Sequence, residues 1–147
     1  MTLVLDLRHV AAIRRHGEAD YPAEACGLIA GAAEGERKVA VQIVPLANQR
    51  TDSARNRYLI DPASFRRAQE RLDRDGLEII GVYHSHPDHR PEPSAFDREH
   101  AWPWLSYVIV GVARGRADEL KSWVLAEDRR VFGPETITIE ERTVVCQ

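Results

Sequence analysis

The segment LEIIGVYHSHPDHRPEPSAFD, residues 77–97, is the stretch from which the fold can be built outward. Its first half, Leu77 to His86, is apolar on both faces, which is typical of a central strand covered by helices on either side. Pro87 to Pro93 contains three prolines and is expected to be a loop. Ser94 then opens a short helix that Pro103 stops. The segment therefore predicts a buried strand that runs into a loop and a short helix.

The sequence on either side of this segment predicts a mixed sheet with about three helices. A helix is expected from Leu7 to Tyr21, because apolar residues recur there every three or four positions. Asp61 and Pro62 offer a cap and a first-turn proline for a second helix, which ends at Gly76. Further strands are expected at 3–5, 25–30, 38–44, 107–112, 120–125 and 136–139. Together with the central strand, these elements predict an α+β fold.

Composition and charge argue against several classes of function. The 147 residues suit one domain, residues 1–147, and 44% hydrophobic with 29% charged residues is typical of a globular protein. A formal net charge of -3 and a pI near 6.1 give no basic surface for nucleic acid. Asp6 and Arg8 interrupt the apolar start that a secretory signal needs, and no apolar run reaches membrane-spanning length. We expect a cytoplasmic protein without nucleic-acid or membrane partners, and the sequence predicts no oligomeric state.

His84 and His86 form a His-x-His pair at the end of the predicted central strand. Because side chains alternate along a strand, both imidazoles project to one face, and Ile80 and Val82 are expected to continue that face. Asp97 follows eleven residues after His86 and offers an anionic oxygen. Two nitrogens and one oxygen with an open fourth position are typical of catalytic zinc. We therefore predict one zinc ion per chain, held by His84, His86 and Asp97.

Other interpretations of the same residues stay open at this point. Ser94 and Asp97 have the spacing of a capping pair at a helix start, and two strand histidines need not bind a metal. His89 and His100 are competing ligands, since His89 follows the pair closely and His100 lies one helical turn beyond Asp97. A site ligated by histidines alone is therefore the alternative.

A hydrolytic metal site also needs a carboxylate that takes a proton from water and returns it to the leaving group. Glu24 lies at the entry to the strand expected at 25–30, and it reaches the site if that strand neighbours the central one. The alternative for Glu24 is a surface acid near a helix end. Cys26 and Cys146 are too few for a disulfide framework, so reduced thiols are expected, with a redox influence of Cys26 on the site as the alternative.

The order and spacing of these residues resemble the JAMM (MPN-plus) metalloprotease family. The family pattern is a glutamate followed much later by His-x-His-Pro-x6-Ser-x2-Asp. This chain matches every position of the pattern, at Glu24, His84, Ser85, His86, Pro87, Ser94 and Asp97. Glu24-Ala25-Cys26-Gly27, together with Asn48, is similar to the small stand-alone prokaryotic members.

The resemblance implies an MPN domain, a deaminase-like mixed sheet that is partly barrel-like, and zinc-dependent hydrolysis of amide or isopeptide bonds. It implies that Glu24 is the general base and that Ser94 hydrogen-bonds the oxyanion. The prokaryotic members cleave adducts from the Gly-Gly tail of ubiquitin-like or sulfur-carrier proteins, so such a tail is the implied substrate. Asn48, Trp102 and Trp104 are candidate contacts for this tail, with core packing as the alternative for the two tryptophans.

Two other classes of protein compete with this interpretation. A zinc deaminase would need a Pro-Cys-x-x-Cys motif, whereas the two cysteines of this chain are far apart. A non-catalytic MPN-type interaction module is expected to have lost metal ligands, whereas the whole pattern is present here. The sequence favours an enzyme, with the interaction module as the alternative.

Overall fold

The computed structural model of the protein describes residues 1–48, 61–99 and 101–141. The elements are β1 (Thr2–Leu5), α1 (Leu7–Asp20), β2 (Cys26–Glu34), β3 (Arg37–Leu46), α2 (Pro62–Arg74), β4 (Glu78–Pro87), α3 (Ala95–Glu99), β5 (Ser106–Ala113), β6 (Arg116–Leu125) and β7 (Phe132–Ile139). Every predicted element is present. Most predicted strands are extended by one to four residues at an end, and α3 ends before the predicted stop at Pro103.

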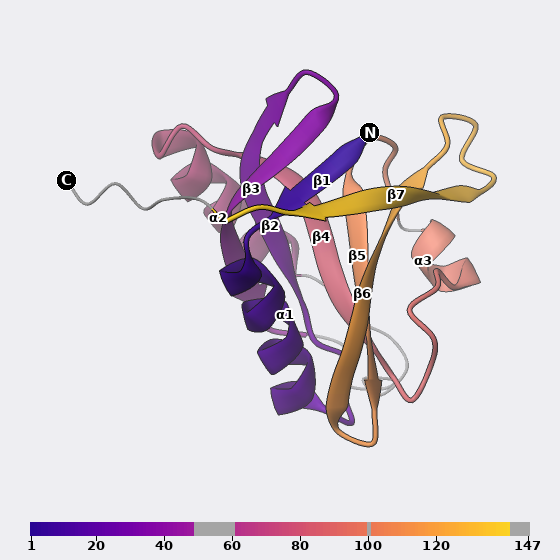
Figure 1. Cartoon of the computed structure of the whole chain (residues 1–147). Helices are drawn as coiled ribbons and strands as arrows, with labels where there is room; N and C mark the ends of the chain where they lie inside the picture. Colours follow the sequence, from indigo (N-terminus) through magenta and orange to yellow (C-terminus); the bar gives the residue numbers. More distant parts are fainter. Residues whose placement is uncertain (49–60, 100, 142–147) are drawn as a thin grey trace.

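The strands form a closed barrel in the order β1-β3-β2-β4-β5-β6-β7 (Figure 1). Strand β1 runs parallel to both of its neighbours, β3 and β7, and β4 runs parallel to β5, whereas the other pairs are antiparallel. Because β2 lies directly beside β4, the start of β2 reaches the end of β4 that carries the histidines. The predicted α+β class and the mixed, barrel-like sheet are confirmed.

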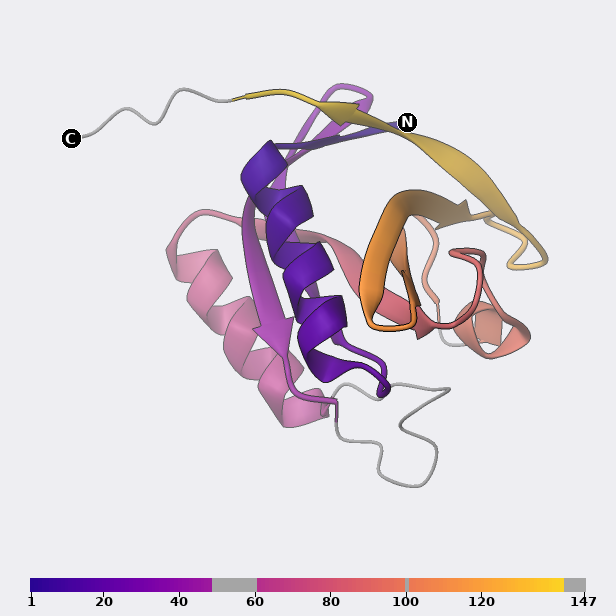
Figure 2. The same cartoon turned by 60° about the horizontal axis from the view of Figure 1, so that its bottom comes forward.

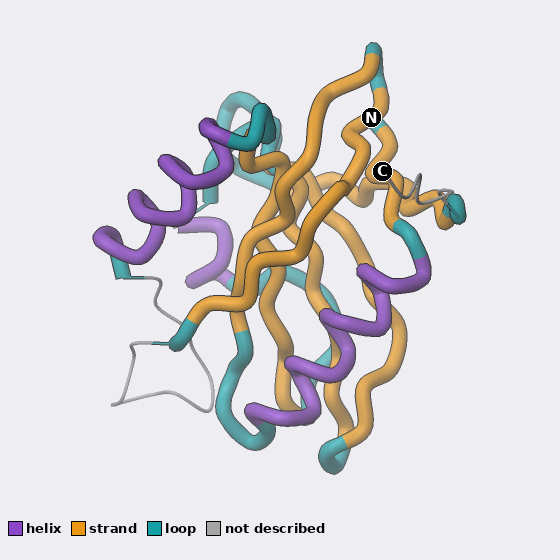
Figure 3. Tube along the Cα trace, turned by 90° about the vertical axis from the view of Figure 1, so that its left-hand side faces the viewer, coloured by secondary structure: helices purple, strands orange, loops and turns teal. Residues whose placement is uncertain are grey.

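The two long helices begin at aspartate caps. Asp6 accepts a hydrogen bond from the Arg8 backbone nitrogen at 2.9 Å, and the His9 ring accepts one from the Asp6 nitrogen at 3.0 Å. Asp61 caps α2 and is followed by Pro62, as the sequence predicts. Helices α1 and α2 lie on opposite sides of the strands (Figure 3). Helix α1 packs against β3, β5 and β6 (Figure 2).

The two faces of β4 contribute to two separate core clusters. Tyr83 packs in the cluster that contains Ile13 of α1, whereas Val82 packs in the cluster that contains Leu72 of α2. Ile80 belongs to the Tyr83 cluster, so the prediction that it shares a face with Val82 is wrong. The β2–β4 pairing shifts by one residue there, and the bulge turns Ile80 to the other face.

In the described ranges, no helix is both long enough and apolar enough to cross a membrane.

Candidate metal centre and its cavity

His84 and His86 lie at the carboxyl end of β4 and point to the same side, as strand alternation predicts. Their Nε2 atoms are 3.1 Å apart, and both side chains are almost completely buried. His84 lies opposite Cys26 of β2 in the strand register, which brings the start of β2 beside the pair. Two imidazole nitrogens therefore converge on one point at the end of the central strand.

The Asp97 carboxylate, on α3 (Ala95–Glu99), lies against both histidines. Its Oδ1 is 3.2 Å from the His84 Nε2, and its Oδ2 is 3.2 Å from the His86 Nε2. The Ser94 nitrogen also donates to Oδ2 at 2.8 Å, while the Asp97 nitrogen donates to the Ser94 Oγ at 3.1 Å. Asp97 is thus both a capping partner of Ser94 and a neighbour of the two histidines, so the two interpretations of this residue hold together.

The charges at this cluster favour an ionised Asp97. Burial raises the pKa of Asp97, but the charge and hydrogen bond of His84, with hydrogen bonds from His86 and the Ser94 nitrogen, hold it well below its usual range. Burial lowers the pKa of His84 despite the opposing influence of Asp97. Burial also tends to lower the pKa of His86, but its hydrogen bonds with Asp97 and the Arg90 carbonyl outweigh this effect and raise the pKa. The cluster therefore presents an ionised carboxylate to the two imidazoles.

The ring of His86 is oriented by the loop that follows it. Its Nδ1 is 2.8 Å from the carbonyl oxygen of Arg90. Since a carbonyl can only accept, Nδ1 carries the hydrogen in this contact, and in the neutral ring the Nε2 lone pair then faces His84 and Asp97. A ligating histidine is commonly fixed by such a bond from its other nitrogen.

The donor set and its spacing fit a tetrahedral metal ion. Ligand atoms about 2.0–2.1 Å from a zinc ion lie about 3.3 Å from one another at tetrahedral corners. The two imidazole nitrogens are 3.1 Å apart, and each lies 3.2 Å from a different oxygen of the Asp97 carboxylate. Two nitrogens and one carboxylate oxygen are also the ligand types that zinc takes. The donor types and the spacing of the nitrogens therefore fit a zinc ion, with one of the two Asp97 oxygens as the third donor.

Glu24 is a second carboxylate at the centre. It is 3% exposed, and its ligand atoms and those of His84 and His86 lie within 4.8 Å of one another. The Ser85 Oγ accepts from the Ala25 nitrogen at 2.8 Å, and the Ser85 nitrogen donates to the Ala25 oxygen at 3.0 Å. Ser85, which faces away from the histidines, therefore ties the Glu24 segment to β4. No sequence pattern indicates this contact of Ser85, although its position on the face opposite the histidines follows from strand alternation.

A cavity of about 450 Å³ gives access to the centre from outside. It is lined by Glu24, His86, Pro87, His89, Arg90, Glu92, Pro93 and Ser94. The Ser94 side chain is exposed at its rim, on the same opening as Glu24 and His86. A substrate in this cavity would contact the general-base candidate and the oxyanion candidate together.

Three residues, Asn48, Trp102 and Trp104, are the candidate contacts for the substrate tail. Asn48 donates from Nδ2 to the Glu24 carbonyl oxygen at 3.0 Å, so it contacts the base segment directly. Trp102 is 67% exposed, and Trp104 packs with its ring centroid 5.2 Å from the Lys38 Nζ. Neither tryptophan lines the cavity beside His86. His89 lines that cavity, but no described contact joins its imidazole to His84 or His86. Among the described residues, the group whose ligand atoms all lie within 4.8 Å of one another is Glu24, His84 and His86, so Glu24 is placed as closely to the two histidines as a ligand would be.

Two further candidates from the sequence, the competing ligand His100 and the second cysteine, Cys146, lie outside the described residues. Cys26 is buried, and burial, with the charges of Asp20 and Glu24, raises the pKa of its thiol to about 12. A neutral thiol is a poor nucleophile, so the geometry does not support a redox influence of Cys26.

Comparison with known families accounts for this arrangement. Residues 6–126 match the family described as prokaryotic homologs of the JAB domain. The chain belongs to this family. The match runs from the cap of α1 to the end of β6 and includes the whole metal centre. The resemblance to JAMM proteins is confirmed.

Several relatives whose names state an activity are similar to this chain. A desampylase of Haloferax volcanii is 37% identical over 112 residues, which are 74% of this chain and 78% of the relative. A Thermus thermophilus protein named probable TtuB-protein conjugate cleaving protease is 35% identical over 118 residues, 80% of this chain and 72% of the relative. The CysO-cysteine peptidase of Mycobacterium tuberculosis is 28% identical over 127 residues, 85% of this chain and 84% of the relative. These relatives bear out the prediction of an enzyme over a non-catalytic module.

Solved structures share the fold over nearly the whole chain. The solution structure of a Desulfitobacterium hafniense protein has a TM-score of 0.83 at 27% identity and covers 98% of this chain and 96% of its own. A Salinibacter ruber protein has a TM-score of 0.73 at 35% identity, with 95% and 92% covered.

Proposed function

We propose that this protein is a zinc-dependent isopeptidase or amidase that releases groups attached to the C-terminal Gly-Gly of ubiquitin-like or sulfur-carrier proteins. The observation that carries the proposal is the Glu24, His84, His86 and Asp97 cluster, which opens to the cavity beside Ser94. The activities named for the three relatives, on conjugates or on a cysteine adduct, support the substrate class.

In this proposal His84, His86 and Asp97 hold the zinc ion. When bound there, zinc acts as a Lewis acid that activates water and polarises the scissile carbonyl. The Arg90 carbonyl keeps His86 in the tautomer that presents its Nε2. Asp97 supplies the negative charge that a divalent cation requires, and Ser94 holds the Asp97 carboxylate through its backbone nitrogen.

Glu24 and Ser94 act on the substrate. Glu24 takes the proton from the attacking water and returns it to the departing amine, because it is a buried carboxylate beside the two histidines and it lines the cavity that the substrate would enter. The Ser94 Oγ accepts from the Asp97 nitrogen, which leaves its own hydrogen free to be donated to the oxyanion. Asn48 steadies the Glu24 segment at the side where we expect the tail to enter. A role for Trp102 and Trp104 in holding the tail stays a prediction.

The test separates metal binding from proton transfer. Glu24→Gln is expected to keep about one zinc ion per chain, the fold and the thermal transition, but to lose hydrolysis of a carrier conjugate by at least about 100-fold, since general-base catalysis is worth 10²–10⁴. His86→Ala is expected to lose both zinc and activity. Zinc is counted by elemental analysis, and products are weighed by mass spectrometry.

A matched control lies in the same cavity. His89→Ala removes an exposed imidazole near the centre and is expected to leave the zinc content unchanged. Wild-type protein that takes up no zinc, or Glu24→Gln with full activity, would contradict the proposal. An enzyme that cleaves ordinary peptides but no Gly-Gly conjugate would retain the mechanism and overturn the substrate class.

A further inference from the structure

We propose that the Asp88 carboxylate is a positioning group that fixes the geometry of the metal centre by tying three separate segments together. The inference rests on the proposed function, because it concerns the same centre. Asp88 follows the His-Ser-His-Pro stretch directly, and its side chain is exposed rather than directed at the histidines. It therefore acts through its neighbours and not on the substrate.

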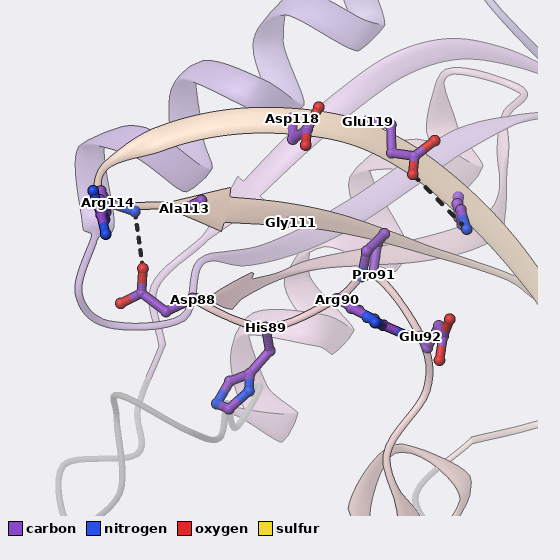
Figure 4. A pocket seen from close by; sticks show the side chains of 11 residues that line it. Asp88, His89, Arg90, Pro91, Glu92, Gly111, Ala113, Arg114, Asp118 and Glu119 are labelled. Carbon is purple, nitrogen blue, oxygen red and sulfur yellow. Dashed lines mark hydrogen bonds and ion pairs between the residues drawn. The ribbon is translucent and has the colours of Figure 1, made fainter.

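The two carboxylate oxygens of Asp88 accept hydrogen bonds from two different segments of the chain. Oδ2 accepts a hydrogen bond from the Tyr21 hydroxyl at 2.7 Å, and Tyr21 is the residue that caps the end of α1. Oδ1 accepts from the backbone nitrogen of Arg114 at 2.8 Å, in the turn between β5 and β6 (Figure 4). The Asp88 nitrogen also donates to the Val112 oxygen at 2.7 Å. One side chain thus joins α1, the end of β4 and the β5–β6 turn.

The first consequence concerns the orientation of His86. The loop from Asp88 to Pro91 is anchored at its start by the Asp88 contacts and at its end by the Trp123 Nε1, which donates to the Pro91 oxygen at 3.0 Å. Between these anchors lies Arg90, whose carbonyl oxygen is the acceptor 2.8 Å from the His86 Nδ1. If the start of this loop is released, the acceptor that orients His86 loses its fixed position.

The second consequence concerns Glu24. Tyr21 lies three residues before Glu24, and the turn between them is closed by a 2.8 Å bond from the Ala23 nitrogen to the Asp20 oxygen. The Tyr21 to Asp88 bond therefore links the segment that delivers the base to the loop that orients a metal ligand. Through this link Asp88 sets the distance between the Glu24 carboxylate and the proposed metal position.

The backbone at Asp88 allows the side chain to be tested separately from the turn. Its φ is 57°, in the left-handed region that glycine and asparagine adopt readily. Asp88→Gly keeps this conformation accessible and removes both side-chain bonds. Asp88→Asn keeps an oxygen that can accept from Arg114 but removes the charge. Tyr21→Phe removes a single bond and leaves the ring in place.

The experiment measures zinc affinity by competition with a chromophoric chelator, together with kcat and KM on a carrier conjugate. Asp88→Gly is expected to weaken zinc binding by about tenfold, in line with other groups that support a ligand, and to lower kcat with little change in KM. Asp88→Asn and Tyr21→Phe are expected to lose about threefold, since each keeps one arm of the linkage.

The matched control is Asp118→Asn, which removes an exposed carboxylate from the same side of the molecule without touching these contacts (Figure 4). Its zinc affinity and turnover are expected to equal those of the wild type. Asp88→Gly with wild-type zinc affinity and kcat overturns the inference, even if its thermal stability falls. If Asp88→Gly does not fold, Tyr21→Phe with unchanged affinity and turnover overturns it instead. Wild-type protein without zinc would contradict the proposed function itself.

Discussion

Ser85 separates the two histidines and faces the opposite side of β4, toward α1. Its hydroxyl accepts from the Ala25 nitrogen at 2.8 Å, and its side chain is completely buried. A backbone donor buried without an acceptor is costly, so this bond holds the residue next to Glu24 against β4. A residue that touches neither metal nor substrate in the proposed mechanism thus helps to position Glu24, the proposed base.

Ser85→Ala tests this role. The change leaves the Ala25 nitrogen without its acceptor, so the free energy of unfolding is expected to fall by about 1–3 kcal/mol in urea denaturation. Because Glu24 is the base and not a ligand in the proposed mechanism, turnover is expected to fall several-fold while zinc content stays at one per chain. Unchanged stability and turnover would show that water replaces the hydroxyl without cost.

At the scale of the elements, the contact between β2 and β4 depends on the absence of a side chain. Gly27 lies opposite Tyr83, and a Cβ at Gly27 would lie 2.3 Å from the Tyr83 ring. The ring has little room to move, because Tyr83 is fully buried and its hydroxyl is 2.6 Å from the His16 Nδ1. Glycine is therefore needed here for close packing rather than for an unusual backbone.

Gly27→Ala is expected to force the two strands apart beside the metal centre. The free energy of unfolding should fall by about 1–3 kcal/mol, the usual cost of overpacking a core, as measured by chemical denaturation. Gly133→Ala is the control, because a Cβ at Gly133 meets nothing within 4 Å. Its stability should stay within about 0.5 kcal/mol of wild type. Equal effects of the two substitutions would contradict the packing argument.

The elements also show what the sequence can predict. The pairing of His84 with His86 on one face follows from local alternation, and α2 follows from its Asp61-Pro62 cap. The position of Glu24 depends on β2 lying beside β4, a contact between segments about 60 residues apart, which periodicity does not encode. Only the family resemblance predicts that Glu24 reaches the histidines. No sequence pattern predicts the bulge at Ile80.

Burial along β3 also differs from what a local pattern predicts. Alternation over residues 38–44 places Val39, Val41 and Ile43 on one face. In the structure Val39 is 1% exposed but Val41 is 50% exposed, and Lys38 is 0% exposed. The first part of β3 pairs with β1 inside the closed barrel, so a charged residue is enclosed there, and barrel closure depends on all seven strands rather than on one local pattern.

At the scale of the whole molecule, a buried ion pair links four strands of the barrel. The Lys38 Nζ is 3.1 Å from the Glu135 Oε2 and donates to the Trp104 oxygen at 2.6 Å. The Ser106 and Ser122 hydroxyls donate to the Glu135 Oε1 at 2.6 and 2.8 Å. Burial lowers the pKa of Lys38, and the nearby Glu135 opposes this effect. Strands β3, β5, β6 and β7 thus share one charged network.

Removing one partner should leave the other charge buried and uncompensated. Lys38→Met is expected to lower the free energy of unfolding by about 3–5 kcal/mol, and Lys38→Met with Glu135→Gln is expected to recover part of that loss. The control is Lys121→Met, since the exposed Lys121 is 3.8 Å from Glu119 and such pairs contribute about 1 kcal/mol or less. A double variant less stable than Lys38→Met would contradict this account of the pair.

Zinc binding should stabilise the whole fold, because its three proposed ligands join the central strand to α3. A ligand that binds only the folded state at 100 times its dissociation constant adds about 2.7 kcal/mol. For a chain of this size each kcal/mol raises Tm by about 2–4 °C, so zinc is expected to raise Tm by about 5–10 °C, and a chelator should reverse the shift. Differential scanning calorimetry measures both transitions. His86→Ala provides the control, since it lacks one ligand and its Tm should respond little to zinc. A wild-type Tm that zinc leaves unchanged, or an equal rise in His86→Ala, would mean that the ion does not bind at this centre.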